Sequence, residues 1–227
     1  MDTVLVTGAN RGIGLKVVEL LLAEGQRVIA TCRQPGRADA LDALAVEDRL
    51  IVRELDVSDA GSVERLVMSL DDQAIDVLFN NAGVMRRESG VADLDYDEWA
   101  HTLLVNTIAP VRLANALHRN LSASTRARVV TVSSQMGSIE RCGTGAIAYR
   151  SSKSAINMAM ASIAKEWASE GIIVCTVHPG WVRTDMGGQD ATLSVSQSAS
   201  DLVRLIGSLQ ASDNGRFINH DGDTIPW

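Results

Sequence analysis

The sequence predicts an α/β fold in which a doubly wound, seven-stranded parallel sheet has helices on both faces. Short runs rich in Val, Ile and Leu alternate with longer segments in which apolar residues recur at helical spacing. The predicted strands are almost continuously apolar, as expected of strands that are covered on both faces. Glycine-rich turns fall at the ends of strands, and no linker rich in Pro, Gly or Ser divides the chain.

Seven apolar runs are the candidate strands. In chain order they are Val4–Thr7, Arg27–Thr31, Leu50–Arg53, Ile75–Asn80, Arg128–Ser133, Ile172–Val177 and Arg216–Asn219. The segments with helical spacing are Ile13–Ala23, Ala38–Ala45, Ala60–Leu70, Trp99–Leu121, Ala146–Ser169 and Ser198–Leu209. Strand and helix therefore alternate, and right-handed crossovers lay the helices over both faces of a Rossmann-like sheet.

The length of 227 residues suits one α/β domain, so we expect residues 1–227 to form a single domain. With 46% hydrophobic and 22% charged residues, the chain lies well outside the composition of disordered segments. Its formal net charge of -7 disfavours nucleic acids and anionic membranes as partners.

The cysteines Cys32, Cys142 and Cys175 are far apart in the sequence and form no CxxC pair. We therefore expect neither a disulfide framework nor a metal site. The first residues run directly into the apolar strand at Val4, without the charged and apolar regions of an export signal. Since the apolar runs are also far shorter than the ~20 residues of a membrane helix, the sequence predicts a cytoplasmic protein with no membrane partner.

A glycine-rich turn, Thr7-Gly8-Ala9-Asn10-Arg11-Gly12-Ile13-Gly14, follows the first predicted strand. Glycine lets the backbone turn tightly and approach a ligand, and the free amides at the start of a helix favour phosphate. Ligands of doubly wound sheets bind at the carboxyl ends of the strands, where this turn lies. Its spacing is not GxGxxG, and taken alone the turn is also compatible with an ordinary loop.

Tyr149 and Lys153 are four residues apart in a predicted helix, which places both side chains on one helix face. An ammonium beside a phenol stabilises the phenolate, so we expect Lys153 to lower the pKa of Tyr149. By spacing alone, such a pair is more often a surface pair. The pair Ser133-Ser134 ends the fifth predicted strand, and a serine hydroxyl can polarise a carbonyl group. We predict Ser134 as the catalytic serine, with Ser133 as the alternative.

Three motifs together resemble those of the short-chain dehydrogenase/reductase superfamily. They are TGxxxGIG at 7–14, Asn-Asn-Ala-Gly at 80–83 and YxxxK at 149–153. The resemblance spans nearly the whole chain. The run from Tyr149 to Ala155 and the final residues 221–227 are similar to the C-factor and sniffer-like carbonyl reductases of this superfamily.

The resemblance implies an oxidoreductase whose catalytic residues are Ser134, Tyr149, Lys153 and Asn106. Asn106 would anchor a water beside Lys153, and the alternative is a structural helix asparagine that faces solvent, which is common. The loop between Ser134 and Tyr149 is longer than the family pattern. The implied cofactor-binding residues are Gly8, Asn10, Arg11, Gly12, Ile13, Gly14, Arg33, Asp56, Val57, Asn80, Ala82, Gly83, Tyr149, Lys153, Pro179, Gly180, Val182 and Thr184.

The end of the second predicted strand, Thr31-Cys32-Arg33, lacks the carboxylate that binds the ribose 2′-hydroxyl of NAD. Arg33 and Arg11 can instead make charge-assisted contacts with a 2′-phosphate. NADP(H) is therefore the predicted cofactor. Either arginine alone is also compatible with a solvated surface residue.

We expect reversible hydride transfer between NADP(H) and a small ketone or aldehyde, with the alcohol as the reduced form and Tyr149 exchanging the proton. An NAD-dependent alcohol dehydrogenase and a catalytically silent nucleotide-binding sensor or scaffold are the alternatives, because a fold alone does not establish function. The resemblance also implies a homodimer or homotetramer that pairs through the helices at Trp99–Leu121 and Ala146–Ser169.

The segment from Asp185 to Gln197 is short and contains Gly187-Gly188. It predicts a brief lid over an open or mobile substrate pocket, although any surface connection has a similar composition. The side chains that could line this pocket are Met136, Ile139, Trp181 and Met186, and ordinary packing is the alternative for each.

Overall fold

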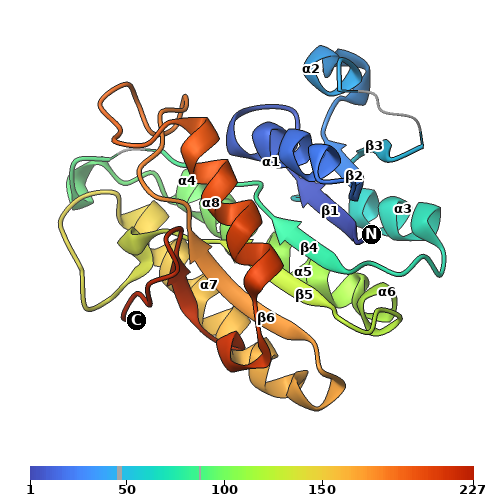
Figure 1. Ribbon diagram of the computed structural model, residues 1–227. Coiled ribbons are helices and arrows are strands. Elements are labelled where there is room, and N and C mark those ends of the chain that lie inside the picture. Colours follow the sequence, from blue (N-terminus) through green and yellow to red (C-terminus); the bar gives the residue numbers. More distant parts are fainter. Residues whose placement is uncertain (45–47, 87) are drawn as a thin grey trace.

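The computed structural model describes residues 1–44, 48–86 and 88–227 and contains a seven-stranded parallel sheet in the order β3-β2-β1-β4-β5-β6-β7 (Figure 1). Its strands are β1 (Thr3–Thr7), β2 (Arg27–Cys32), β3 (Leu50–Glu54), β4 (Val77–Asn80), β5 (Arg128–Val132), β6 (Ile173–His178) and β7 (Phe217–Asn219). The predicted doubly wound fold is confirmed. Strand order reverses between β1 and β4, and the crevice at such a reversal is where these sheets bind ligands.

The helices are α1 (Gly12–Ala23), α2 (Asp39–Asp42), α3 (Ala60–Leu70), α4 (Tyr96–Leu103), α5 (Ala109–Ala116), α6 (His118–Ser122), α7 (Ile147–Glu166) and α8 (Val195–Ser208). Figure 1 shows α1 and α8 in front of the sheet, with α5 and α7 behind it. In the part of the chain that the structure describes, no helix has the length and apolarity needed to span a membrane.

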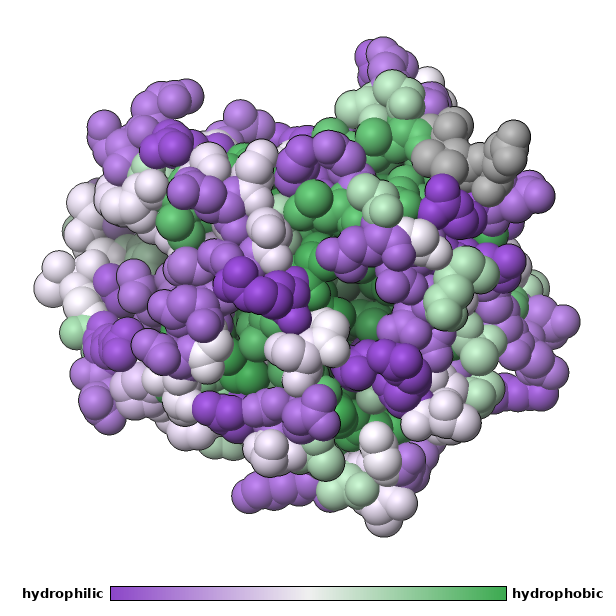
Figure 2. Space-filling view, viewed as in Figure 1, coloured by the Kyte–Doolittle hydropathy of each residue, from purple (hydrophilic) through white to green (hydrophobic). Residues whose placement is uncertain are grey.

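Alternate residues of each strand face opposite helix layers, as the two-residue period of a strand requires. Val4 and Val6 of β1 pack in a core with α1 and α8, whereas Leu5 between them packs with α3, α5 and α7. This arrangement explains why the strands have no polar alternation in sequence. The face that carries α1 and α8 is largely hydrophilic at its surface, and hydrophobic residues are seen between the polar ones (Figure 2).

The prediction of one continuous helix at Trp99–Leu121 is wrong. The chain begins α4 at Tyr96, passes through a π-helical segment at Leu104–Ile108 and continues as α5 and α6. Pro110 has no amide N–H, so it cannot supply the helical hydrogen bond to the carbonyl group of Asn106, four residues earlier. The wider π-helical turn and this proline together interrupt the regular helix beside Asn106.

The helix predicted at Ala38–Ala45 is also shorter than expected. A 3₁₀ turn at Pro35–Arg37 precedes α2, which covers only Asp39–Asp42, and residues 45–47 lie outside the described residues. Several other predicted elements differ from the observed ones by one to three residues at an end, and boundaries are the least certain part of such predictions.

Candidate active site

Tyr149 and Lys153 lie one turn apart in α7, and both side chains are buried. The Lys153 Nζ lies 5.7 Å from the centroid of the Tyr149 ring, and it donates to the carbonyl oxygen of Val132 over 2.8 Å. The hydroxyl of Ser134 lies beside the Tyr149 phenol and acts on its pKa. The structure therefore brings three of the predicted catalytic residues together at the carboxyl end of β5.

Burial raises the pKa of Tyr149 to about 12, and the neighbouring Ser134 hydroxyl acts in the opposite direction. Burial also lowers the pKa of Lys153 to about 8. The pKa of Tyr149 is therefore higher than its ordinary value and not lower as expected, because desolvation of the buried phenolate outweighs its stabilisation by nearby groups. Near neutral pH the phenol keeps its proton, which is the form that can donate one.

The two serines at the end of β5 have different partners. Ser133 donates from its hydroxyl to the Lys153 carbonyl oxygen at 3.4 Å, whereas Ser134 is the one that reaches Tyr149. The turn Gln135–Gly137 packs directly on α7, since a Cβ on Gly137 would lie 2.7 Å from the Lys153 carbonyl carbon. The turn that follows Ser134 is thereby held against α7, although the loop as a whole is long.

Asn106 is buried, which excludes the alternative of a helix asparagine that faces solvent. Its Nδ2 donates to the carbonyl oxygen of Val84 at 2.8 Å and to the Ser152 hydroxyl at 3.0 Å, and its Oδ1 accepts from the Val84 amide at 2.9 Å. Both amide hydrogens are used, so the donor capacity of the side chain is filled. A Cβ on Gly83 would lie 3.3 Å from the Asn106 Oδ1 and 3.8 Å from the Lys153 Nζ, which places both groups beside this glycine.

The glycine-rich turn has the shape that a phosphate-binding turn needs. Gly8 and Gly12 have φ values of 62° and 54°, in the left-handed region that favours glycine. A Cβ on Gly14 would lie 2.4 Å from the Gly8 carbonyl oxygen, so a side chain has no room there. Arg11 is the N-cap residue of α1, and Gly12 and Ile13 are the first residues of this helix, whose positive end suits an anion. These residues fit a dinucleotide pyrophosphate.

Asn81 and Thr7 hold this turn in place, and sequence analysis did not include them among the site residues. The Asn81 Nδ2 donates to the carbonyl oxygens of Thr7 and Gly8 at 2.9 and 3.2 Å. The Thr7 hydroxyl accepts from the amides of Asn81 and Ala82, both at 3.0 Å. A polar residue at the end of a strand, next to a glycine-rich turn, was the signal that could have identified them.

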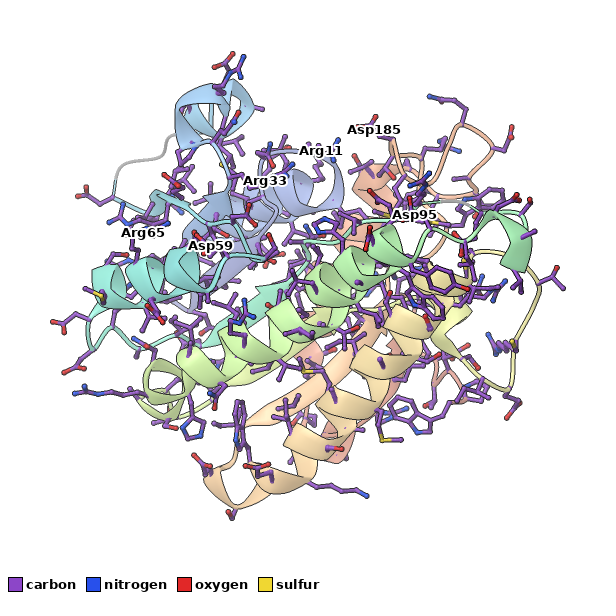
Figure 3. The ribbon with its side chains drawn as sticks, turned by 180° about the vertical axis from the view of Figure 1, so that it is seen from behind. Arg11, Arg33, Asp59, Arg65, Asp95 and Asp185 are labelled. Carbon is purple, nitrogen blue, oxygen red and sulfur yellow. The ribbon has the colours of Figure 1, made fainter. Side chains whose placement is uncertain are left out.

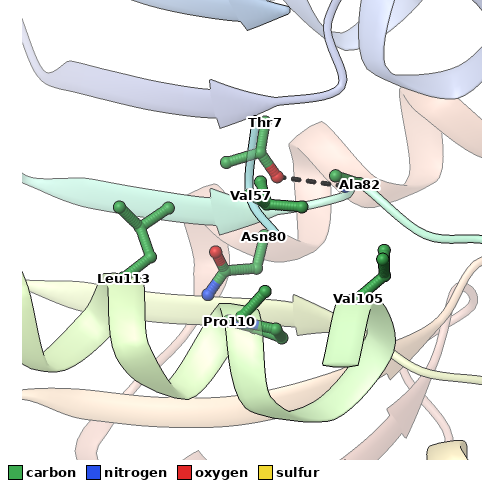
Figure 4. A pocket seen from close by; sticks show the side chains of 8 residues that line it. Thr7, Val57, Asn80, Ala82, Val105, Pro110 and Leu113 are labelled. Atoms are coloured by element: carbon green, nitrogen blue, oxygen red, sulfur yellow. Dashed lines mark hydrogen bonds between the residues drawn. The ribbon is translucent and has the colours of Figure 1, made fainter. Parts of the chain in front are cut away.

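A small cavity lies beside β1 and β4, on the side of α5 (Figure 4). Three of the predicted cofactor-binding residues, Val57, Asn80 and Ala82, line this cavity. The complete lining is Thr7, Val57, Asn80, Ala82, Val105, Ala109, Pro110 and Leu113. Next to Val57, hydrogen bonds from Ser58 hold the pKa of Asp56 below its ordinary value, and the nearby Arg33 guanidinium lowers it further.

The predicted phosphate-binding arginines are on the surface. Figure 3 shows Arg33, Arg11 and Asp185 along one rim of the molecule. Arg33 is exposed, and Arg11 forms an exposed ion pair with Asp185, with 2.8 Å between Nη1 and Oδ2. The Arg11 guanidinium is therefore already paired with a carboxylate of the segment that follows β6, and a cofactor phosphate would compete with that carboxylate.

The turn Pro179-Gly180 lies at the end of β6 and is fixed from two sides. The Ser198 hydroxyl of α8 donates to the Pro179 carbonyl oxygen at 2.7 Å, and Gly180 has a φ of 82°. Val182, two residues after Gly180, is buried and forms a β-bridge with Leu193. This turn is therefore preformed beside the crevice.

The segment after Val182, where the lid is predicted, is held by several hydrogen bonds. Thr184 accepts the Gly187 amide on its hydroxyl at 3.1 Å, and its carbonyl oxygen accepts the Gly188 amide at 2.9 Å. The Trp181 indole donates to the Gly187 carbonyl oxygen at 2.9 Å. The methyl group of Thr184 would lie 3.7 Å from a Cβ on Gly12, so the segment reaches the glycine-rich turn.

The profile of the family described as short chain dehydrogenase matches residues 2–192, which is most of the chain. The chain belongs to this family. Its predicted membership of this family of oxidoreductases is confirmed.

Individual members of the short-chain dehydrogenase family show the same relationship. C-signal of Myxococcus xanthus is 41% identical over 154 residues, which are 67% of this chain and 93% of that protein. The structure of the carbonyl reductase Sniffer of D. melanogaster covers 100% of both chains with a TM-score of 0.96 and 35% identity. The NADPH-bound carbonyl reductase from chicken fatty liver has a TM-score of 0.94 and 32% identity over 100% of this chain and 94% of that chain.

Proposed function

We propose that this short-chain dehydrogenase reduces a ketone or aldehyde to an alcohol with NADPH, reversibly, and that Tyr149 is the proton donor. The observation that carries the proposal is the buried group of Ser134, Tyr149 and Lys153, in which the Ser134 hydroxyl lies beside the protonated phenol. Two neighbouring hydroxyls can both bind one substrate oxygen. The similarity to carbonyl reductase structures supports the same chemistry.

NADP(H) is the proposed cofactor. The glycine-rich turn supplies the close approach that a pyrophosphate needs, and no carboxylate follows β2, where Arg33 is exposed and available to a 2′-phosphate. The chicken carbonyl reductase, which the chain resembles over its full length, is NADPH-bound. When bound, the cofactor supplies the hydride.

The chain's own residues supply orientation and the proton. Ser134 donates a hydrogen bond to the carbonyl oxygen of the substrate, and Tyr149 transfers its proton to the same oxygen. Lys153 is held by the Val132 carbonyl oxygen; an ammonium has three donors, which leaves capacity for ribose hydroxyls. Its positive charge lies 5.7 Å from the Tyr149 ring and stabilises the phenolate that remains after proton transfer.

Consumption of NADPH with a panel of ketones and aldehydes tests this function, with NADH measured in parallel. Substituting Tyr149→Phe removes the proton and keeps the ring, so kcat/KM should fall by roughly 10²–10⁴-fold while the Kd for NADPH stays close to that of the wild type. Near wild-type turnover in this variant would refute the role of Tyr149. Turnover with NAD⁺ and alcohols alone would favour an NAD-dependent alcohol dehydrogenase, and binding of NADPH without turnover would favour a sensor or scaffold.

A further inference from the structure

The first turn of α7, the helix that carries Tyr149, has no capping side chain of its own. Its N-cap residue is Ala146, which adopts a left-handed conformation with φ 50° and ψ 42° and has no side-chain oxygen to offer. The amides in the first turn of a helix have no partner within the helix, and a cap normally satisfies one of them. The start of the catalytic helix therefore depends on other parts of the chain.

Glu88, in the segment that follows β4, provides these contacts. Its Oε1 accepts the amide N–H of Ala148 at 2.8 Å, and its own carbonyl oxygen accepts the amide N–H of Ala146 at 3.1 Å. A Cβ on Gly145 would lie 3.3 Å from the same carbonyl oxygen, so the backbone approaches Glu88 closely. One residue thus binds α7 through both its side chain and its backbone, immediately before Tyr149.

We propose that Glu88 is a positioning residue, which acts as the missing N-cap of α7 and fixes the Tyr149 phenol for proton transfer; this inference rests on the proposed function. A carboxylate at a helix N-terminus makes a charge-assisted hydrogen bond and is favoured by the positive end of the helix dipole. Because Ala148 directly precedes Tyr149, a displacement of this turn moves the phenol. A displacement of about 1 Å from the productive geometry can reduce turnover roughly a hundredfold.

The segment that carries Glu88 is held to α7 at a second point. Asn106 binds both backbone polar groups of Val84 and donates to Ser152 in α7, and the Ser152 hydroxyl donates to the Tyr149 carbonyl oxygen at 2.7 Å. Val84 and Glu88 are therefore both connected to the start of α7, Val84 through Asn106 and Glu88 directly.

The acidic neighbours of Glu88 have different partners. Glu88 lines a shallow depression together with Asp95 and Glu98, and Arg86 pairs with those two carboxylates at 3.3 and 4.0 Å. Glu98 is therefore a matched control, because it is an acidic residue of the same depression whose ion pair is with Arg86.

The test compares Glu88→Ala, Glu88→Gln and Glu98→Ala in the full-length protein. Amide hydrogen exchange at 146–149 reports the cap directly, and kcat and the Kd for NADPH report its effect on the site. We expect Glu88→Ala to exchange faster at these amides and to lose roughly ten- to a hundredfold in kcat, with the Kd for NADPH nearly unchanged. Glu88→Gln should keep kcat within about threefold of the wild type, because an amide oxygen can accept the same hydrogen bond.

Glu98→Ala should match the wild type in exchange and kcat. Wild-type exchange and kcat in Glu88→Ala, or an equal loss in Glu98→Ala, would overturn the role of Glu88. If Glu88→Ala does not fold, Glu88→Asp replaces it. The side chain of this variant is one methylene shorter, so its kcat should fall, whereas Glu88→Gln should keep the kcat of the wild type. Equal kcat values in the two variants would overturn the proposal. If the wild type reduces no carbonyl compound, the proposed function fails, whereas the exchange measurement still decides whether Glu88 caps α7.

Discussion

Two groups of side chains are held in opposite ways. One group surrounds Tyr149, and the other, which we call the phosphate rim, consists of Arg11, Arg33 and Asp185. Tyr149 and Lys153 are buried and bound to their surroundings by hydrogen bonds or a close ring contact. At the rim, the side chains of Arg11 and Asp185 are 72% and 87% exposed, and their ion pair is open to water. Buried contacts fix geometry, whereas exposed charges are screened by salt and can exchange partners. The difference indicates that the catalytic group is preorganised and that the rim adapts to the cofactor.

The largest expected effect is that of Gly14→Ala, which places a Cβ 2.4 Å from the Gly8 carbonyl oxygen and 2.6 Å from the Asn81 Nδ2. Because the closest clash is with backbone, the free energy of unfolding should fall by about 3 kcal/mol, and NADPH binding should be lost. The matched control is Gly207→Ala in α8, where an added Cβ would have no atom within 4 Å beyond its chain neighbours and the backbone of its own helix. There the free energy of unfolding should rise by about 0.5–1 kcal/mol. Urea unfolding measures both, and equal effects would show that the glycine-rich turn is not tightly packed.

The pH dependence of the stability of Lys153→Met should reveal the free-energy cost of burying the ammonium group. The pKa of Lys153 is about 8 in the fold, below its ordinary value of 10.5, so between these values the unfolded chain binds more protons and stability rises with pH. The stability of Lys153→Met relative to the wild type should therefore decrease by about 3 kcal/mol between pH 7 and pH 10.5. Lys165→Met, an exposed site on the same helix, should follow the wild type. A constant difference for Lys153→Met would contradict the burial argument.

Arg33→Ala tests whether the rim selects the cofactor. Loss of a charge-assisted contact with the 2′-phosphate should raise the Kd for NADPH by roughly tenfold or more and leave the Kd for NADH unchanged. The loss should shrink as salt is added, because Arg33 is exposed. Arg65→Ala, an exposed arginine on α3 that pairs with Asp59, is the control and should leave both affinities unchanged. Fluorescence titration measures both, and an unchanged NADPH preference in Arg33→Ala would refute our explanation of cofactor choice.

The smallest effect is expected from Asp185→Asn, which removes the partner of Arg11 and keeps the size of the side chain. The exposed ion pair contributes little, so the melting temperature should not change, while NADPH binding should tighten by about two- to fivefold because Arg11 no longer has a competing anion. Asp190→Asn in the same segment is the control and should bind NADPH like the wild type. Weaker NADPH binding in Asp185→Asn would show instead that the pair orders the turn.

Much of the catalytic group was predictable because it depends on local spacing. The interval from Tyr149 to Lys153 is one helical turn, and the order of strands and turns brings Ser134 to the same edge of the sheet. The pKa values were not predictable, because desolvation depends on how many elements cover a side chain. The role of Asn81, which holds the glycine-rich turn from β4, was missed because the two segments are far apart in sequence.

The sequence by itself determined the doubly wound sheet, the glycine-rich turn and the set of residues at the carboxyl ends of the strands, because periodicity and turn chemistry are local properties. Only the tertiary structure decided that the helix around Asn106 is interrupted, that Arg11 pairs with Asp185 and that Glu88 caps α7. Each of these depends on a contact between segments that are distant in sequence or on the space available inside the fold. Such contacts are set by packing, which no pattern along the chain records.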